Sequence, residues 1–182
     1  MIDVYTNYVS TAIVHHGALE NIPEHRASPG ILFLKHFLPI FDSLSPKLHP
    51  SFPSFLHPNC LIHCNLLKPT PLIWERSNIS VTRNEELWTF HRKMLHVYEI
   101  QRPAGFGKPG GCTVIFECVL VMQGRGEHRQ KFMKQINMFE LEEFGSRMRL
   151  CEVRSTYLSP LSMWNPEDVE RQMGKNAAAR PA

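Results

Sequence analysis

The chain has 182 residues, of which 43% are hydrophobic and 20% are charged, and these proportions are those of an ordinary globular protein. A chain of this length is expected to form one domain with a substantial core, because it buries roughly two thirds of the surface that its unfolded form exposes. Its net charge of +3 is small and is not gathered into runs, which argues against nucleic-acid binding.

The sequence also shows no sign of a membrane or secreted protein. No stretch approaches the roughly 18 consecutive apolar residues of a transmembrane helix, and the first residues do not have the pattern of a signal peptide. We therefore expect no contact with a membrane and a cytoplasmic location. The odd number of cysteines favours buried thiols in a reducing compartment over a disulfide framework. These cysteines are Cys60, Cys64, Cys112, Cys118 and Cys151.

Residues 1–27 have only weak periodicity and are expected to be an N-terminal extension, with at most a short helix over residues 8–20. A helix is predicted over residues 30–44, because Ser28 and the proline after it form an N-cap followed by proline at the first helical position. We expect it to be buried, and bent or broken near its internal proline. Its dense apolar residues are Ile31, Leu32, Phe33, Leu34, Phe37, Leu38, Ile40, Phe41 and Leu44.

The middle of the chain predicts one strand and a second helix. Residues 60–67 are typical of a strand that ends before two prolines. The helix is predicted over residues 82–98, because Thr82 and Glu85 have the spacing of a capping box. Its apolar face contains Leu87, Met94, Leu95 and Tyr98. The helical period puts Arg92 on its solvent side, as it puts Asp42 on the solvent side of the first helix.

Three long strands are predicted in the last third of the chain, over residues 112–123, 131–141 and 147–158. The segments that connect them have hairpin lengths, so consecutive antiparallel pairing is expected. Residues 163–182 are polar and then rich in alanine, and we expect this C-terminal tail to be partly disordered. Helices followed by a run of antiparallel strands predict an α+β fold.

This order of elements resembles the nuclear transport factor 2-like (SnoaL-like) superfamily, over residues 28–162. The phrases Phe33-Leu34-Lys35-His36-Phe37 and Val153-Arg154-Ser155-Thr156-Tyr157-Leu158-Ser159-Pro160 are most similar to its fungal members. The resemblance implies a curved antiparallel sheet wrapped around helices, which forms a cone with an internal pocket. Similar chains often carry aspartate where this chain has Ser159, so the resemblance gives no acidic role to that position.

The resemblance also implies two classes of function. One is an isomerase, cyclase or dehydratase that needs no cofactor and acts on an apolar molecule of the secondary-metabolite type. The other is a non-catalytic module that uses the same scaffold to bind a small hydrophobic ligand or to dimerise. Similar proteins often form homodimers through the outer face of the sheet.

The candidate catalytic residues are His91, Tyr98 and Tyr157. On the predicted second helix, His91 falls within the apolar face, where an imidazole in a half-dry cavity can act as an acid or base. The alternative is a core histidine that is only hydrogen-bonded. Tyr98 either adds a phenol to the same cavity or covers the end of the helix. Tyr157 is expected to face inward from the last strand.

Alternation along the strands predicts which side chains face the helices. The inward residues that we expect to contact a substrate are Phe116, Cys118, Gln135, Asn137 and Ser155. Amides orient a carbonyl or hydroxyl but do not supply acid–base chemistry. Glu117 is expected on the outer face unless a bulge reverses the alternation. Its apolar neighbours there, Ile115, Val119 and Val121, favour a homodimer that buries this face.

No metal site is predicted. The segment Cys60-Leu61-Ile62-His63-Cys64 brings three potential ligands together, but a zinc site usually needs a fourth. In a strand, His63 also faces away from the two cysteines.

Overall fold

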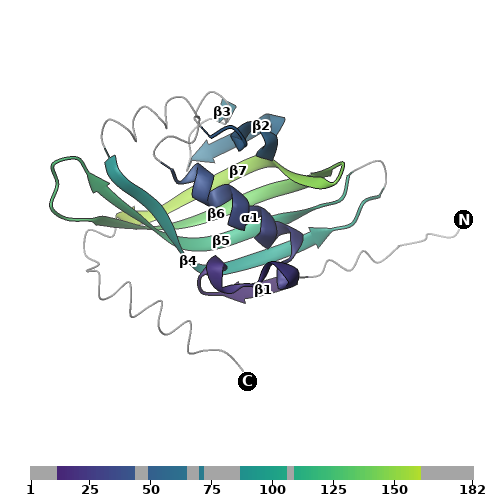
Figure 1. The fold of residues 1–182 in the computed structure, drawn as a ribbon, viewed down its shortest axis with the longest axis horizontal. Helices are drawn as coiled ribbons and strands as arrows, with labels where there is room; N and C mark the ends of the chain where they lie inside the picture. Colours follow the sequence, from purple (N-terminus) through teal and green to yellow (C-terminus); the bar gives the residue numbers. More distant parts are fainter. Residues whose placement is uncertain (1–11, 44–48, 65–69, 72–86, 106–108, 161–182) are drawn as a thin grey trace, which may run out of the picture.

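The computed structural model describes residues 12–43, 49–64, 70–71, 87–105 and 109–160, and these form one curved sheet crossed by a helix (Figure 1). The sheet has seven strands in the order β1-β4-β5-β6-β7-β2-β3. The strands are β1 (Ala12–His16), β2 (Leu56–Cys64), β3 (Thr70–Pro71), β4 (Leu87–Arg102), β5 (Gly111–Gly124), β6 (Lys131–Phe144) and β7 (Arg147–Pro160). The helices are α1 (Pro29–Phe41) and the short 3-10 turns η1 (Leu19–Asn21), η2 (Glu24–Arg26) and η4 (Phe52–Phe55).

The three long strands near the C-terminus are confirmed, with antiparallel pairing of β5 with β6 and of β6 with β7. The strand predicted at 60–67 is found as β2, which starts earlier, at Leu56. Its pairing with β7 is parallel, so the sheet is mixed at this edge and not wholly antiparallel as expected. Residues 65–69 lie outside the described residues. The α+β class and the curved sheet around a helix are confirmed.

The helix predicted at residues 82–98 is wrong, because residues 87–102 form strand β4. A bulge explains the error. Met94 pairs with Cys118 and His96 pairs with Glu117, so Leu95 is an extra residue in the ladder. Inward-facing residues are even-numbered before this bulge and odd-numbered after it, which breaks the period of two that marks a strand. The predicted capping box at 82–85 lies outside the described residues.

The N-terminal segment contributes a strand to the sheet. Strand β1 pairs antiparallel with residues 96–100 of β4, so the helix predicted at 8–20 is wrong over its described part. The sheet thus begins within the segment that we expected to be an extension. Gly17 has a φ of 87°, which favours glycine, and its backbone nitrogen donates to the Leu95 carbonyl over 3.0 Å.

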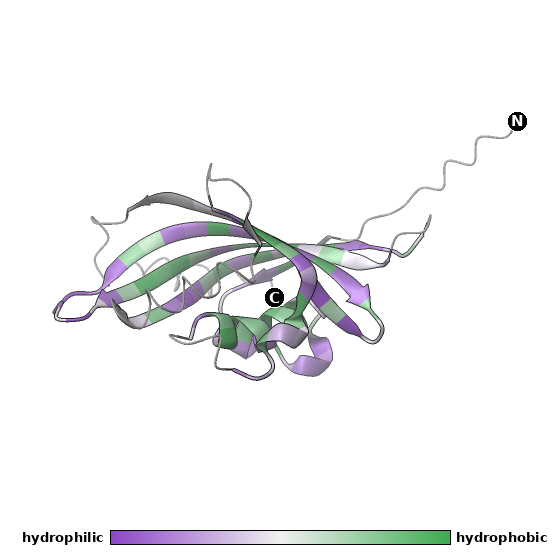
Figure 2. Ribbon diagram, turned by 90° about the horizontal axis from the view of Figure 1, so that it is seen from above, coloured by the Kyte–Doolittle hydropathy of each residue, from purple (hydrophilic) through white to green (hydrophobic). Residues whose placement is uncertain are grey.

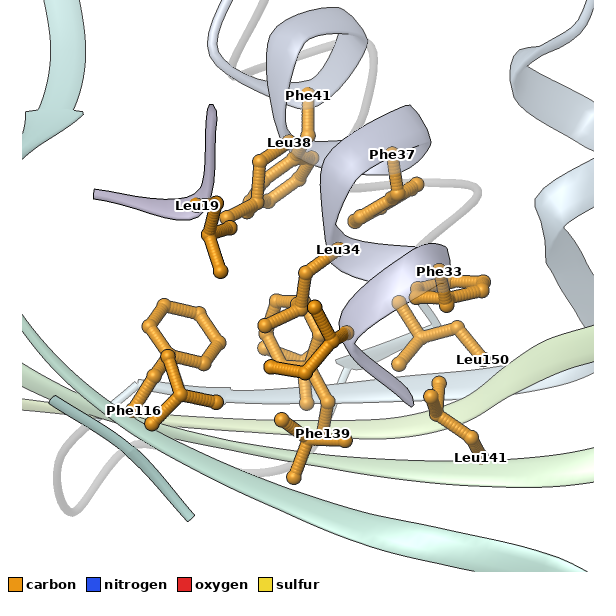
Figure 3. Close-up of a cluster of buried hydrophobic side chains, with 14 of the residues drawn as sticks. Leu19, Phe33, Leu34, Phe37, Leu38, Phe41, Phe116, Phe139, Leu141 and Leu150 are labelled. Atoms are coloured by element: carbon orange, nitrogen blue, oxygen red, sulfur yellow. The ribbon is translucent and has the colours of Figure 1, made fainter. Parts of the chain in front are cut away.

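Helix α1 is confirmed, and it packs on the concave face of the sheet (Figures 2 and 3). Pro39 lies in its last turn and does not break it, since the helix continues to Phe41. The N-terminal end lies very close to the sheet: a Cβ added to Gly30 would be 2.5 Å from Val114 Cγ2. No helix in the described ranges is long and apolar enough to cross a membrane.

Aromatic rings fill much of the space between α1 and the sheet. Phe37 stacks on Phe33 and on Phe41, with 5.1 Å between ring centroids in both cases. On the sheet, Phe116 and Phe139 meet edge to face at 4.9 Å, and the edge of Phe139 reaches Phe37 at 5.9 Å. Figure 3 shows these side chains converging from the helix and the strands. This part of the cone is therefore a packed core.

Candidate functional site

Next to the aromatic core, the concave side of the sheet holds a buried polar cluster. It consists of Asp42 after α1, Arg92 on β4, Cys118 on β5, Gln135 and Asn137 on β6 and Ser155 on β7. Gln135 is 0% exposed and Asn137 is 1% exposed. Side chains this deeply buried must find partners inside the protein, because none is available from bulk water.

The charged part of the cluster is the ion pair between Asp42 and Arg92, whose side chains are 10% and 5% exposed. The guanidinium Nη1 donates to Asp42 Oδ1, and the backbone nitrogen of Arg92 donates to Oδ2 over 3.0 Å. The guanidinium also lies over the rings of Phe41, at 5.1 Å, and Phe90, at 5.5 Å. This pairing and stacking stabilises a charge that would otherwise be costly to bury.

The neutral part of the cluster is a chain of hydrogen bonds that ends on Gln135 Oε1. Ser155 Oγ donates to Asn137 Oδ1 over 2.7 Å, and Asn137 Nδ2 donates to Gln135 Oε1 over 3.1 Å. Arg92 Nε donates to the same oxygen over 3.0 Å. The Cys118 thiol also approaches this oxygen, with 3.7 Å between Sγ and Oε1.

The amide nitrogen of Gln135 is left without a partner. A guanidinium only donates, so the atom that faces Arg92 must be the oxygen, and this fixes the orientation of the amide. Gln135 Nε2 is then a buried donor that makes no hydrogen bond. Leaving such a group unpaired costs about 1 to 3 kcal/mol, which a bound acceptor would recover. The cluster thus contains one unmet donor, Gln135 Nε2.

The neutral members of the cluster do not supply an acid or base near neutral pH. Burial raises the pKa of the Cys118 thiol to about 12, so the thiol stays protonated. Two amides and a hydroxyl do not titrate in this range, and an arginine does not lose its proton in proteins. The cluster offers hydrogen bonds and a fixed ion pair.

A partly open pocket of ≈ 520 Å³ lies beside the cluster, between α1 and β4. Asp42 and Arg92 form part of its wall, together with apolar residues that include Leu34, Leu38 and Met94. Strand β1 pairs only with residues 96–100 of β4, so the preceding part of β4 is free to border this pocket. The volume is within the range of small-molecule sites.

The inward positions predicted for Phe116, Cys118, Gln135, Asn137 and Ser155 are confirmed, since all five are buried. Four of them meet in the cluster, whereas Phe116 belongs to the aromatic core. Contact of any of them with a substrate stays a prediction.

The positions predicted for His91 and Tyr98 are wrong. His91 is a surface residue of β4 that borders the pocket, and the partial burial of its ring, together with the charge of Lys93, lowers its pKa. Tyr98 is 42% exposed and lies between Val14 and Ile115 on the outer face. Both were placed by a helical period, which does not apply to a strand. The backbone of Tyr157 pairs with Gln135, but its side chain lies outside the described residues.

The sequence interpretation missed Asp42 and Arg92, because it placed both on solvent-facing sides of helices. The alternation Phe90-Arg92-Met94 gives the signal that would have found Arg92, since in a strand the arginine shares a face with its two apolar neighbours. It also missed Glu99, which is fully buried at the other end of α1. In the segment considered for a metal, Cys60 is buried in the core and His63 Nε2 lies 3.0 Å from Glu152 Oε1.

No protein-family model matches the chain, and no curated protein matches it in sequence. Solved structures do match. A candidate scytalone dehydratase from Novosphingobium aromaticivorans superposes with a TM-score of 0.54 at 4% identity, over 70% of this chain and 80% of that one. ActVI-ORFA from Streptomyces coelicolor gives 0.50 at 11% identity, over 71% and 95%. A candidate aromatic ring hydroxylase from N. aromaticivorans gives 0.52 at 10% identity, over 71% and 87%.

These neighbours have the cone-like NTF2-like (SnoaL-like) fold, and likeness at such low identity shows the fold alone. This chain therefore has the NTF2-like fold, as the sequence resemblance implied. The similarity to fungal members in particular stays a prediction.

Proposed function

We propose that the chain binds a small, largely apolar molecule in the pocket beside α1, and that Gln135 Nε2 holds an acceptor atom of this molecule. The unpaired, orientation-fixed donor of Gln135 is the observation that carries the proposal. Gln135 is fully buried directly behind Arg92, which donates to it and lines the pocket, so an acceptor atom reaches Nε2 when side chains of the pocket wall move aside. An acceptor at the inner end of a ligand would complete the cluster, while the apolar walls would hold the rest of the molecule.

The charge balance of the cluster indicates what kind of acceptor is bound. Asp42 neutralises Arg92 within the protein, so the cluster has no excess positive charge to offer a carboxylate. A neutral acceptor such as a carbonyl oxygen suits a single amide donor better. The predicted ligand is thus a neutral, hydrophobic molecule; the family resemblance adds the expectations that it is of the secondary-metabolite type and that no cofactor is needed.

The second candidate function is a cofactor-independent isomerase, cyclase or dehydratase. One of the structural neighbours is described as a candidate dehydratase, and a specific residue favours this alternative. His15 on β1 pairs with the inward-facing Val97, and its Nε2 is buried without a hydrogen-bond partner. Burial lowers the pKa of His15, with the nearby Glu99 charge opposing this effect. A neutral imidazole of this kind is a usable general base.

Native mass spectrometry of the purified chain, followed by extraction, tests the proposal by identifying co-purified molecules. Binding of the identified molecule is then compared between the wild type and Gln135→Glu. This variant keeps an acceptor for Arg92 Nε but replaces the unpaired donor with an oxygen. We expect affinity to fall about tenfold, which corresponds to the loss of one neutral hydrogen bond.

Gln123→Glu is the matched control, because Gln123 lies on β5 outside the cluster and bonds to the Glu127 carbonyl. It should leave the affinity unchanged. Equal affinities of the wild type and Gln135→Glu, with both proteins folded, would exclude the role of Gln135. Turnover of the identified molecule that is lost in His15→Gln would instead favour the enzyme.

We further propose that two copies associate through the outer face of the sheet. Val119 and Val121, which were expected in this interface, are already buried within a single chain. A row of apolar residues nevertheless remains on this face, in register across four strands: Val14, Tyr98, Ile115 and Met138. Light scattering should show a dimer at micromolar concentrations, and Ile115→Lys should give a monomer. A wild-type monomer under these conditions would remove the proposal.

A further inference from the structure

Two histidines meet on the outer face of the sheet, the face opposite the polar cluster. His16, the last residue of β1, lies directly opposite His96 on β4. Their Nδ1 atoms are 2.9 Å apart, and their ring centroids are 5.1 Å apart with the ring planes at 88°. The contact is exposed to solvent.

The backbone holds this pair in place from both sides. His96 directly follows the bulge residue Leu95, and His16 is followed by Gly17, whose nitrogen donates to the Leu95 carbonyl over 3.0 Å. The bulge and the glycine turn are therefore joined at the point where the two imidazoles face each other. A pair fixed in this way loses little conformational entropy when a ligand binds across it.

We infer that His16 and His96 bind a divalent transition-metal ion through their Nδ1 atoms. Two imidazole nitrogens bound to one ion at roughly 2.0 to 2.1 Å lie about 2.8 to 3.4 Å apart, depending on whether the geometry is square-planar or tetrahedral. The observed 2.9 Å separation is within this range, so binding needs only small rotations of the rings. This site is independent of the function proposed for the pocket.

The ligand chemistry selects the class of ion. Imidazole nitrogens suit Cu²⁺, Ni²⁺ and Zn²⁺, whereas Mg²⁺ and Ca²⁺ prefer oxygen ligands. The 2.9 Å separation is closest to that of neighbouring positions in a square-planar ion, and Cu²⁺ also has the highest affinity in the divalent series. No third histidine, cysteine or carboxylate completes a metal-binding group in the described part of the chain, so water fills the other positions.

Metal binding by the neutral histidine pair releases no net proton. In the neutral pair, one Nδ1–H donates to the Nδ1 lone pair of the other ring, so one imidazole is the Nδ1–H tautomer and the other is the Nε2–H tautomer. Metal binding needs both Nδ1 lone pairs. The first ring therefore moves its proton to Nε2, where solvent accepts the hydrogen bond.

The charged groups around the pair do not compete with this site. Glu117 pairs with His96 across β4 and β5, but its carboxylate forms an ion pair with Lys134 on β6. Tyr98 lies next along β4, with its ring centroid 6.5 Å from that of His96.

The experiment uses the full chain without a histidine tag, stripped with EDTA and desalted, and titrated with CuCl₂ in a calorimeter. The variants are His16→Gln and His96→Gln, and His91→Gln on the same strand is the control. We expect one Cu²⁺ site that each of the first two variants weakens by about tenfold or more, because removing a ligand costs at least as much as removing its outer-sphere support. The control should bind as the wild type does.

Two further measurements sharpen the result. Electron paramagnetic resonance of the Cu²⁺ complex should show two equivalent nitrogen ligands in the wild type and one in each variant. MgCl₂ should give no heat. The inference is overturned if the wild type and both variants bind Cu²⁺ with the same stoichiometry and affinity, or if the wild-type spectrum shows no pair of nitrogens.

Discussion

The two ends of helix α1 are both attached to strand β4 by a buried carboxylate, but in different ways. At the N-terminal end, Glu99 of β4 accepts hydrogen bonds from the Ser28 hydroxyl and from the Ile31 backbone nitrogen at 3.2 Å. At the C-terminal end, the carboxylate belongs to Asp42 and its partner on β4 is Arg92. Glu99 is thus held by neutral donors and a helix N-terminus, whereas Asp42 is held by a full positive charge.

The two ends also differ in how far their hydrogen-bond networks extend into the sheet. At the Glu99 end, the carboxylate accepts from the free Ile31 amide, Gly30 brings the helix against the sheet, and a pocket of ≈ 330 Å³ borders Glu99. The Asp42 end continues through Arg92 to Gln135, whose buried donor has no partner, and it borders a pocket. The two ends therefore differ in the charge of the group that holds the carboxylate, while each has one buried polar atom without a partner nearby: Gln135 Nε2 at the Asp42 end and His15 Nε2 at the Glu99 end.

The largest expected effect comes from breaking the ion pair at the C-terminal end. Asp42→Ala leaves the Arg92 guanidinium buried without its counter-charge, so the free energy of unfolding should fall by about 3 to 5 kcal/mol. Urea denaturation at pH 7.5 measures this loss. A loss below about 1 kcal/mol would mean that solvent reaches the pair, and the contrast between the two ends would disappear.

A double-mutant cycle separates the pair from its surroundings. Arg92→Met replaces the guanidinium with an apolar side chain, and the double variant Asp42→Ala/Arg92→Met should be less destabilised than the sum of the two single variants. The coupling should be within the range of about 0.5 to 3 kcal/mol that contacting residues show. Strict additivity would contradict a direct interaction.

A smaller effect is expected at the other end. Glu99→Gln keeps one oxygen that accepts a hydrogen bond but removes the negative charge near the helix N-terminus. The free energy of unfolding should therefore fall by only about 1 to 2 kcal/mol. Glu20→Gln, at an exposed position, is the control and should have no measurable effect. If Glu99→Gln proved more harmful than Asp42→Ala, the order that we assign to the two ends would be reversed.

The parts of the fold that were predictable are those whose pattern is local. Strand β5 is densely apolar, and in β6 buried and less buried side chains alternate from Gln135 to Leu141, so the strands and their hairpin could be predicted from residue order. Strand β4 could not, because the bulge at Leu95 changes which residues face inward halfway along. The pairing of β1 with β4 joins residues about eighty positions apart, such as His16 and His96. No local pattern in the sequence predicts such a pairing.

Some residues of the candidate site were also predictable from the sequence, and others were not. Alternation along β6 was enough to place Gln135 and Asn137 inside, because that strand has no irregularity between them. The ion pair was not predictable, since Asp42 and Arg92 are 50 residues apart and a charged residue is usually exposed. Only the contact between the two elements makes each charge acceptable inside the protein.

The smallest expected effect is a pH dependence of the free energy of unfolding, which His15, close to Glu99, should cause. Burial lowers the pKa of His15 in the folded chain, and the Glu99 charge opposes this shift while His16 adds to it. Since the folded state binds the proton less readily than the unfolded state, the stability from the neutral imidazole is fully present above the unfolded pKa of about 6.5 and is lost as the pH falls toward the folded value. Between pH 7.5 and 5.5, the wild type should therefore lose more stability than His15→Gln does, as measured by urea denaturation at each pH.

His36→Gln, at an exposed position of α1, should keep the wild-type pH dependence. Parallel curves for the wild type and His15→Gln would show that the imidazole is as well hydrated in the folded chain as in the unfolded one, and His15 would then no longer support the enzyme as the second candidate function.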